Sequence, residues 1–170
     1  PIDDLELSIE EQCMQLLALQ QPLAKDLRKV GTILKASTDL ERMADQATNI
    51  AELTLAIGSS PLIKPLIDIP RMAELARGMV HDSIEAFVRE DEQLARDVCQ
   101  EDEEVDLLYA SLFEELVGFL SQGKEGKDAE QIVQLLFTAR ALERIADHAT
   151  NISERVVYMI TGQVVKLNGF

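Results

Sequence analysis

Two almost identical stretches carry acidic residues at a spacing that suits cation binding. The first, LERMADQATNIAE, runs from Leu40 to Glu52, and the second, LERIADHATNISE, runs from Leu142 to Glu154. In each stretch a Glu is followed four residues later by an Asp, and side chains at i and i+4 are neighbours on one face of an α-helix. Carboxylate oxygens are the ligands that hard multivalent cations prefer. The repeat therefore predicts two carboxylate stripes, one in each half of the chain.

Both stripes contain further polar residues at helical spacing. The stripes comprise Glu41, Asp45, Thr48 and Glu52 in the first copy, with Asn49 beside them, and Glu143, Asp147, Thr150 and Glu154 in the second, with Asn151 beside them. On a helical wheel each stripe lies roughly 100° from the centre of the apolar face, so we expect it to flank the core and to be reachable from solvent. Asn is a mediocre helix former, and its recurrence in both copies favours a site over a merely solvated face.

A third acidic pair, Asp102 and Asp106, flanks an apolar seam in the preceding helical stretch. Two helices packed antiparallel could bring two such pairs together, and carboxylates crowded without positive charge repel one another until a cation bridges them. We therefore interpret the following six acids as candidate metal ligands, with iron, zinc, manganese and magnesium all left open: Glu41, Asp45, Asp102, Asp106, Glu143 and Asp147.

Four further residues are additional candidates, as ligands or as supporting groups. His148 stands where the first copy has Gln46, and a nitrogen ligand there would favour a transition metal over magnesium. Asp3 aligns with Asp106 in the repeat, and Asn49 and Asn151 lie beside their stripes.

The composition predicts an all-α protein. Of 170 residues, 46% are apolar, only 4% are aromatic and none is Trp, which favours helices packed through aliphatic side chains. Proline, glycine and apolar periodicity predict helices ending near Gln20, from Pro22 to about Ile57, from Pro70 to Arg89, from about Asp91 to Leu120 and from Lys127 to Ile160.

The repeat extends beyond the two motifs, since Asp3 and Ser8 match Asp106 and Ser111. This predicts two tandem three-helix bundles, of which the first lacks its leading helix and the earlier acid of its second pair before Pro1. We expect a first bundle at 1–57, a linker at 58–69 and a second bundle at 70–162. Apolar surface on the first bundle would favour a homodimer.

Charge and cysteine usage limit the function classes. The formal net charge of -15 disfavours a nucleic-acid surface and favours cations or basic protein surfaces as partners. Cys13 and Cys99 form no CxxC motif, as expected of a reduced cytoplasmic protein. No apolar run reaches the roughly 18 residues of a membrane span, and no signal-peptide pattern is visible. Because the sequence starts at Pro1 rather than Met, a leader peptide before it stays open as an alternative. No Gly-rich loop or basic cluster indicates a site for phosphate.

Two alternatives remain open. In the first, a metal-free interaction bundle docks basic residues of a partner on the same acids. In the second, the protein is a ferritin-like di-iron oxidase, a class whose iron site uses Glu-x-x-His pairs. Neither histidine makes such a pair, because the residue three positions before His81 is Gly78 and the one before His148 is Ile145.

The stretches DLERMADQATNIAE and ALERIADHATNISE resemble the paired signature helices of the PhoU family, and LLALQQPLAKDLR, at residues 16–28, resembles its first helix junction. The resemblance implies two three-helix bundles whose E(D)-x-x-x-D motifs bind metal ions. It also implies a cytoplasmic regulator without catalytic activity that restrains phosphate uptake and phosphate-starvation signalling. The implied partners are the phosphate transporter's ATPase subunit and a sensor histidine kinase.

Overall fold

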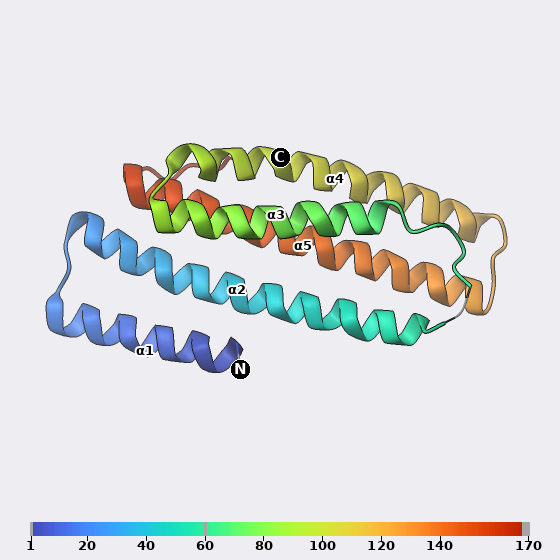
Figure 1. The fold of residues 1–170 in the computed structure, drawn as a ribbon, viewed down its shortest axis with the longest axis horizontal. Coiled ribbons are helices and arrows are strands. Elements are labelled where there is room, and N and C mark those ends of the chain that lie inside the picture. The colour runs from blue at the N-terminus through green and yellow to red at the C-terminus, as the bar shows by residue number, and fades with distance from the viewer. Residues whose placement is uncertain (1, 60, 168–170) are drawn as a thin grey trace.

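A computed structural model describes residues 2–59 and 61–167, which form five α-helices and no strand (Figure 1). The helices are α1 (Ile2–Gln20), α2 (Ala24–Ile57), α3 (Asp68–Arg89), α4 (Glu92–Ser121) and α5 (Lys127–Thr161). The all-α prediction is confirmed, and each expected helix is present with its ends within a few residues of those expected.

Two helix starts differ from the expected positions. Leu23 is extended, with φ -121° and ψ 160°, so α2 begins at Ala24 and leaves Pro22 outside the helix. Helix α3 begins at Asp68 rather than Pro70, which places Pro70 in the first turn, where a missing N–H costs nothing.

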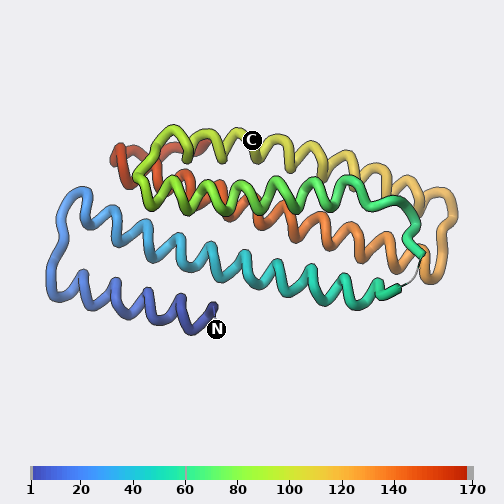
Figure 2. Tube along the Cα trace, viewed as in Figure 1, coloured from blue at the N-terminus to red at the C-terminus, as the bar shows by residue number. Residues whose placement is uncertain are grey.

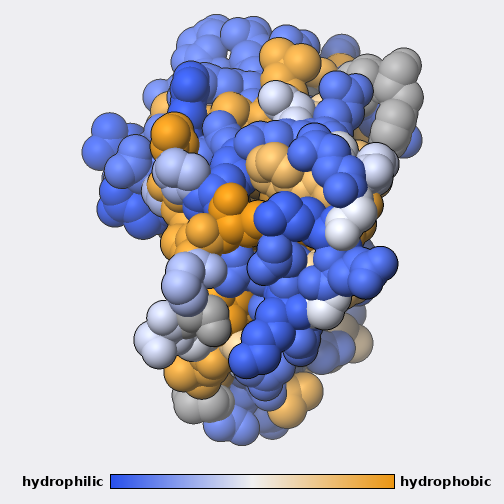
Figure 3. All heavy atoms as spheres, turned by 90° about the vertical axis from the view of Figure 1, so that its right-hand side faces the viewer, coloured by the Kyte–Doolittle hydropathy of each residue, from blue (hydrophilic) through white to orange (hydrophobic). Residues whose placement is uncertain are grey.

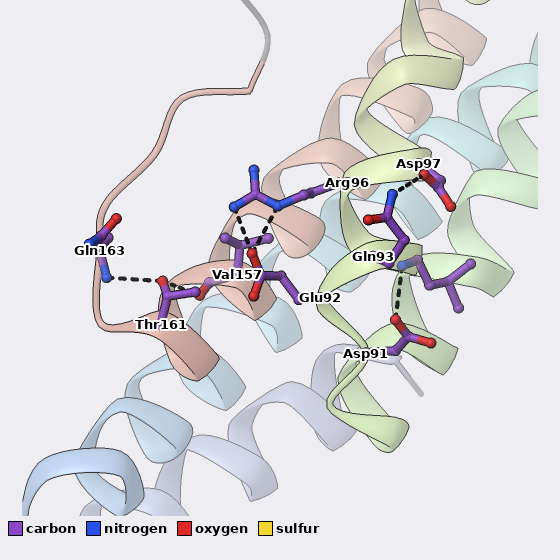
Figure 4. Close-up of polar contacts among 9 residues, drawn as sticks. Asp91, Glu92, Gln93, Arg96, Asp97, Val157, Thr161 and Gln163 are labelled. Carbon is purple, nitrogen blue, oxygen red and sulfur yellow. Dashed lines mark hydrogen bonds and ion pairs between the residues drawn. The ribbon is translucent and has the colours of Figure 1, made fainter.

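Local side-chain contacts explain where α4 begins and where α5 ends (Figure 4). Asp91 precedes α4, and its carboxylate accepts a hydrogen bond from the backbone N–H of Leu94 at 3.0 Å. Such a cap satisfies one of the four N–H groups that a helix start leaves without a partner. At the end of α5, the Thr161 hydroxyl donates to the Val157 carbonyl and accepts from the N–H of Gln163.

Helix α5 is the centre of the molecule. It packs against α2, α3 and α4, while α3 and α4 also pack against each other, so α3, α4 and α5 form a three-helix bundle with α2 laid along its side (Figures 1 and 2). Five fully or almost fully buried side chains of this core are Met72, Met79, Leu116, Ile132 and Val156. Burial of such side chains is the main stabilising contribution to the fold.

Polar contacts fix the alignment of α2 along α5, which run antiparallel. They are Arg28 Nε to the Met159 carbonyl at 3.1 Å, Thr32 Oγ1 to the Arg155 carbonyl at 3.4 Å, and Asp39 Oδ1 to His148 Nδ1 at 2.9 Å. The residue number rises along α2 as it falls along α5. These contacts join the first half of the chain to the second.

The connection between α2 and α3 is held against α5 by one side chain. The amide of Gln131 accepts a hydrogen bond from the N–H of Ile63 at 2.7 Å and donates to the Pro61 carbonyl at 3.2 Å. Figure 3 faces this end of the molecule and shows a largely hydrophilic surface with separate hydrophobic patches.

Helix α1 lies at the outer edge of the fold and packs only against α2 among the described elements (Figure 1). Several large apolar side chains of α1 are exposed: Leu5, Leu7, Met14, Leu16 and Leu19. Within the described ranges, no helix combines the length and the apolar character that crossing a membrane requires.

Candidate functional site

Acidic side chains of α4 and α5 line one open groove of about 610 Å³. Its lining residues are Asp102, Asp106, Arg140, Glu143, Arg144, Asp147, His148, Thr150, Asn151, Glu154 and Lys166. The expectation that antiparallel packing brings the Asp102/Asp106 pair to the Glu143/Asp147 pair is confirmed. We call this feature the acidic groove.

The four central acids of the acidic groove differ in exposure. Asp106 and Asp147 are exposed, but Glu143 and Asp102 retain only 8% and 2% of their accessible surface. The expectation that the stripe on α5 is reachable from solvent is therefore wrong for Glu143 and for Thr150, which is also buried. The reason is that α4 packs directly over this face of α5, which a wheel of one helix cannot reveal.

Burial and mutual repulsion make the acidic groove hold protons more tightly than free carboxylates do. Burial, reinforced by the nearby Asp147 carboxylate, raises the pKa of Glu143 to about 7. Partial desolvation by the surrounding protein and the Asp106 carboxylate raise the pKa of Asp147, and partial desolvation raises the pKa of Asp106, although both side chains keep access to solvent. Crowded carboxylates with raised pKa values are a setting in which a cation can take the place of protons.

Arg140 is the basic residue that forms an ion pair with one of these acids. Its Nη1 forms an ion pair with Glu143 Oε1, one helical turn away, and its guanidinium carbon lies 5.7 Å from the centre of the Tyr109 ring. Glu143 Oε2 is buried and has no hydrogen-bond partner among the described residues. The Glu143 carboxylate is thus neutralised on one oxygen and left without a partner on the other.

His148 lies between the acidic groove and α2. It lines the groove, yet its Nδ1 contacts Asp39 Oδ1 at 2.9 Å, and both side chains are about nine-tenths buried. Asp39 was not among the candidates, because its partner lies 109 residues away and no local spacing connects them.

The segment after α5 returns over the acidic groove. The N–H of Leu167 donates to Glu154 Oε1 at 2.7 Å, and Lys166 contributes to the groove lining. Sequence reasoning missed Lys166. It also missed Arg140, although its i, i+3 spacing to Glu143 is a helical ion-pair signal.

The acidic groove gathers oxygen donors without closing them around one point. In the part of the chain that the structure describes, no group of three or more His, Cys, Asp or Glu side chains stands ready to hold a metal ion. The donor types suit a hard cation, and Glu143 Oε2, which has no hydrogen-bond partner among the described residues, is an acceptor that a cation can satisfy. The residues therefore fit a cation by chemistry, and side-chain rotation would have to complete its shell.

The first copy of the motif lies in a more open place. Glu41 on α2 is half-buried and Asp45 is exposed, and Asp3 and Glu6 of α1 lie near enough that their carboxylates help to raise the pKa of Glu41, after its partial desolvation and Asp45. Asn49 is exposed on α2. The structure thus brings Asp3 toward Glu41, as the repeat suggested.

Comparison with known proteins agrees with this arrangement. The model of the PhoU domain family matches residues 1–54 and 69–156, which include both acidic motifs. The chain belongs to the PhoU family. A PhoU homolog from Clostridium acetobutylicum is 38% identical over 98% of this chain and 76% of its own length, and one from Aquifex aeolicus is 41% identical over 97% and 74%.

Solved PhoU structures have the same fold. The crystal structure of PhoU from Pseudomonas aeruginosa superposes with a TM-score of 0.88 at 34% identity, covering 95% of this chain and 77% of that one. The phosphate transport system regulatory protein PhoU from Streptococcus pneumoniae gives 0.87 at 33%, covering 97% and 76%. The Clostridium and Aquifex relatives are named phosphate-specific transport system accessory proteins.

Proposed function

We propose that this protein regulates phosphate uptake and phosphate-starvation signalling as an accessory protein of a phosphate-specific transport system. The observation that carries the proposal is membership of the PhoU family over almost the whole chain, with relatives bearing that name. Within this role the protein acts from the cytoplasm as a helical adaptor between the transporter's ATPase subunit and a sensor histidine kinase.

Cells in which the chromosomal gene for this protein has been deleted provide the test. Without it we expect faster uptake of radiolabelled phosphate, and expression of phosphate-starvation genes even in phosphate-rich medium, with both reversed by a plasmid copy. Unchanged uptake and unchanged expression would contradict the regulatory role. Crosslinking from a benzoylphenylalanine placed at exposed sites on α1 and α4 would identify the ATPase and kinase contacts.

We further propose that the acidic groove binds a divalent or transition-metal cation. Glu143 and Asp147 of α5, with Asp102 and Asp106 of α4, would hold it, and Asn151 and His148 lie at the same groove. The bound cation would neutralise crowded carboxylates and tie α4 to α5. The orphaned buried oxygen of Glu143 supports this assignment, because a buried acceptor without a partner carries a desolvation cost that a cation would offset.

Elemental analysis of the untagged protein tests the metal proposal. We expect iron, zinc, manganese or magnesium to copurify, and to be lost from the Glu143→Ala/Asp147→Ala variant. A Glu41→Ala/Asp45→Ala variant removes the same residues from the first copy and measures separately how much metal that copy holds. If the second-copy variant retained the parent's full metal content, the acidic groove would not be the site.

The first copy supports a second, weaker cation site in the same proposal. Glu41 and Asp45 would be joined by Asp3 of α1, with Asn49 beside them. Because this surface is more exposed than the acidic groove, water competes more strongly with it for the cation.

A metal-free reading of the acidic groove has one observation in its favour. Arg140 and Lys166 of this chain already line the groove, so it accommodates basic side chains. In that case a basic segment of a partner would occupy the groove, and the purified protein would contain no stoichiometric metal.

We also propose a homodimer through the exposed apolar side chains of α1. Sedimentation of the parent and of a Leu5→Glu/Leu19→Glu variant would test it.

A further inference from the structure

Arg140 lines the acidic groove and pairs with Glu143. Its ion pair with Glu143 Oε1 holds the guanidinium at the groove, and the ring of Tyr109 on α4 lies 5.7 Å from the guanidinium carbon. The side chain nevertheless keeps half of its accessible surface. It is therefore held by two contacts but is free to swing outward.

One guanidinium lies at the same groove as three of its acids. Arg140 pairs directly with Glu143, and Asp106 and Asp147 line the groove beside it. It thus supplies part of the positive charge that a bound cation would supply. Two cations that neutralise the same carboxylates compete for them.

The Glu143 carboxylate is where this competition is sharpest. Arg140 occupies Oε1, while Oε2 is buried without a hydrogen-bond partner among the described residues. While Arg140 keeps this ion pair, Glu143 Oε1 is not open to a second cation.

We propose that Arg140 is a built-in, displaceable counter-cation that competes with a divalent cation for Glu143 and so sets the cation affinity of the acidic groove. The inference rests on the proposed function, in which this groove binds a cation. On binding, Arg140 leaves Glu143 Oε1, and its side chain turns to solvent or stays over the ring of Tyr109, a favourable position for a guanidinium. Glu143 Oε1 then becomes available as a ligand.

Arg144 provides a matched control. The groove lining contains the acids Asp102, Asp106, Glu143, Asp147 and Glu154 and the bases Arg140, Arg144 and Lys166, so it has two more acids than bases. Arg140→Gln and Arg144→Gln each remove one positive charge from the same lining. Arg144 is exposed and forms no ion pair with Glu143 among the described contacts, so only Arg140→Gln releases that carboxylate.

The experiment is titration of the metal-free full chain with Mn²⁺, followed by calorimetry and by the loss of the free Mn²⁺ electron paramagnetic resonance signal. We expect Arg140→Gln to bind Mn²⁺ about tenfold more tightly than the parent, the size of effect that one charge-assisted contact gives, and Arg144→Gln to differ from the parent by no more than about threefold. Adding Glu143→Gln to Arg140→Gln should remove the gain. Circular dichroism checks that each variant is folded, including the double variant with its substitution at the buried Glu143.

The outcomes separate this inference from the proposed metal site. If the parent and both variants bind Mn²⁺ with equal affinity, the groove binds a cation but Arg140 does not control it. Equal gains in both arginine variants would show only a general charge effect and would overturn the inference. If none of the proteins binds Mn²⁺, the metal site itself is wrong. Binding by Arg140→Gln alone would support the inference, with the parent's groove closed by its own arginine.

Discussion

The two copies of the acidic motif have nearly the same sequence and very different surroundings. On α5, Ala146, Ala149 and Thr150 are buried; their counterparts on α2, Ala44, Ala47 and Thr48, are half-buried or exposed. The difference follows from how closely other helices surround each copy. Helix α5 packs closely against α2, α3 and α4, whereas α2 packs closely against α1 and α5 and reaches Glu90 at the end of α3 through ion pairs of Lys25 and Lys29. A helix's sequence sets which face is apolar, and its neighbours set how deeply each face is buried.

The electrostatics of the two copies diverge for the same reason. Glu143 and Glu41 occupy equivalent places, yet α4 covers Glu143 and raises its pKa to about 7, while Glu41 remains partly exposed beside α1. The surrounding charges differ as well: Arg140 stands three residues before Glu143, and Thr38, at the equivalent place, instead donates a hydrogen bond to Glu6 at 2.9 Å. The carboxylate of the second copy is thus the more buried of the two, and it is held by an ion pair to Arg140.

The largest expected effect concerns the residue that distinguishes the copies most, His148 in place of Gln46. Replacing its partner in Asp39→Ala leaves a buried imidazole without its acceptor, and we expect the free energy of unfolding to fall by about 3 kcal/mol. Urea denaturation at neutral pH measures this. His148→Gln, which restores the residue of the first copy, should cost less, because the Gln amide can still donate to Asp39. A loss from Asp39→Ala no greater than that from the exposed Glu52→Ala would contradict the role of the pair.

A smaller effect tests the difference in packing with one substitution made twice. Ala149 is fully buried and Ala47 is exposed at the equivalent position. We expect Ala149→Leu to lower the free energy of unfolding by about 2 kcal/mol through overpacking, and Ala47→Leu to change it by no more than about 0.5 kcal/mol. Thermal and urea unfolding of the two variants provide the comparison. Equal losses would mean that both copies are packed alike in solution.

The smallest effect is a change in the pH dependence of stability. The pKa of Glu143 is raised from 4.5 to about 7 on folding, so the folded state binds this proton more tightly than the unfolded state, and stability falls as pH rises through that interval. Glu143→Gln cannot ionise and should be more stable than the parent at about pH 8 by about 1 kcal/mol, after allowance for solvent screening. Unfolding would be measured with a chelator present. Glu41→Gln should change the pH dependence of stability less. If the free energy of unfolding varied with pH in the same way for Glu143→Gln and the parent, the raised pKa of Glu143 would be disproved.

Much of this architecture can be predicted from the sequence. The apolar periodicity of residues 132–156 and the prolines around the linker define the helices, and the repeat places Glu143 and Asp147 on one face, opposite Asp102 and Asp106. Such inferences succeed because they depend on residues within a few turns of one another. The metal itself stays a prediction.

The remaining features depend on contacts between distant segments. The burial of Glu143 depends on where α4 lies, the Asp39–His148 pair joins residues 109 positions apart, and Lys166 reaches the groove only because the chain turns back after α5. No local period encodes these contacts. They are fixed by packing, and only the structure reveals them.

The alignment of α2 along α5 has a mechanical consequence. Its three polar contacts are distributed from Arg28 to Asp39 along α2, and each joins one particular residue on α5. A slide of one residue, about 1.5 Å along the axis, would put all three out of alignment at once, and the buried Asp39 would face no imidazole. Sliding of α2 along α5 is therefore disfavoured, because it breaks all three contacts together, and we expect movement of α2 to occur as a tilt away from α5 rather than along its axis.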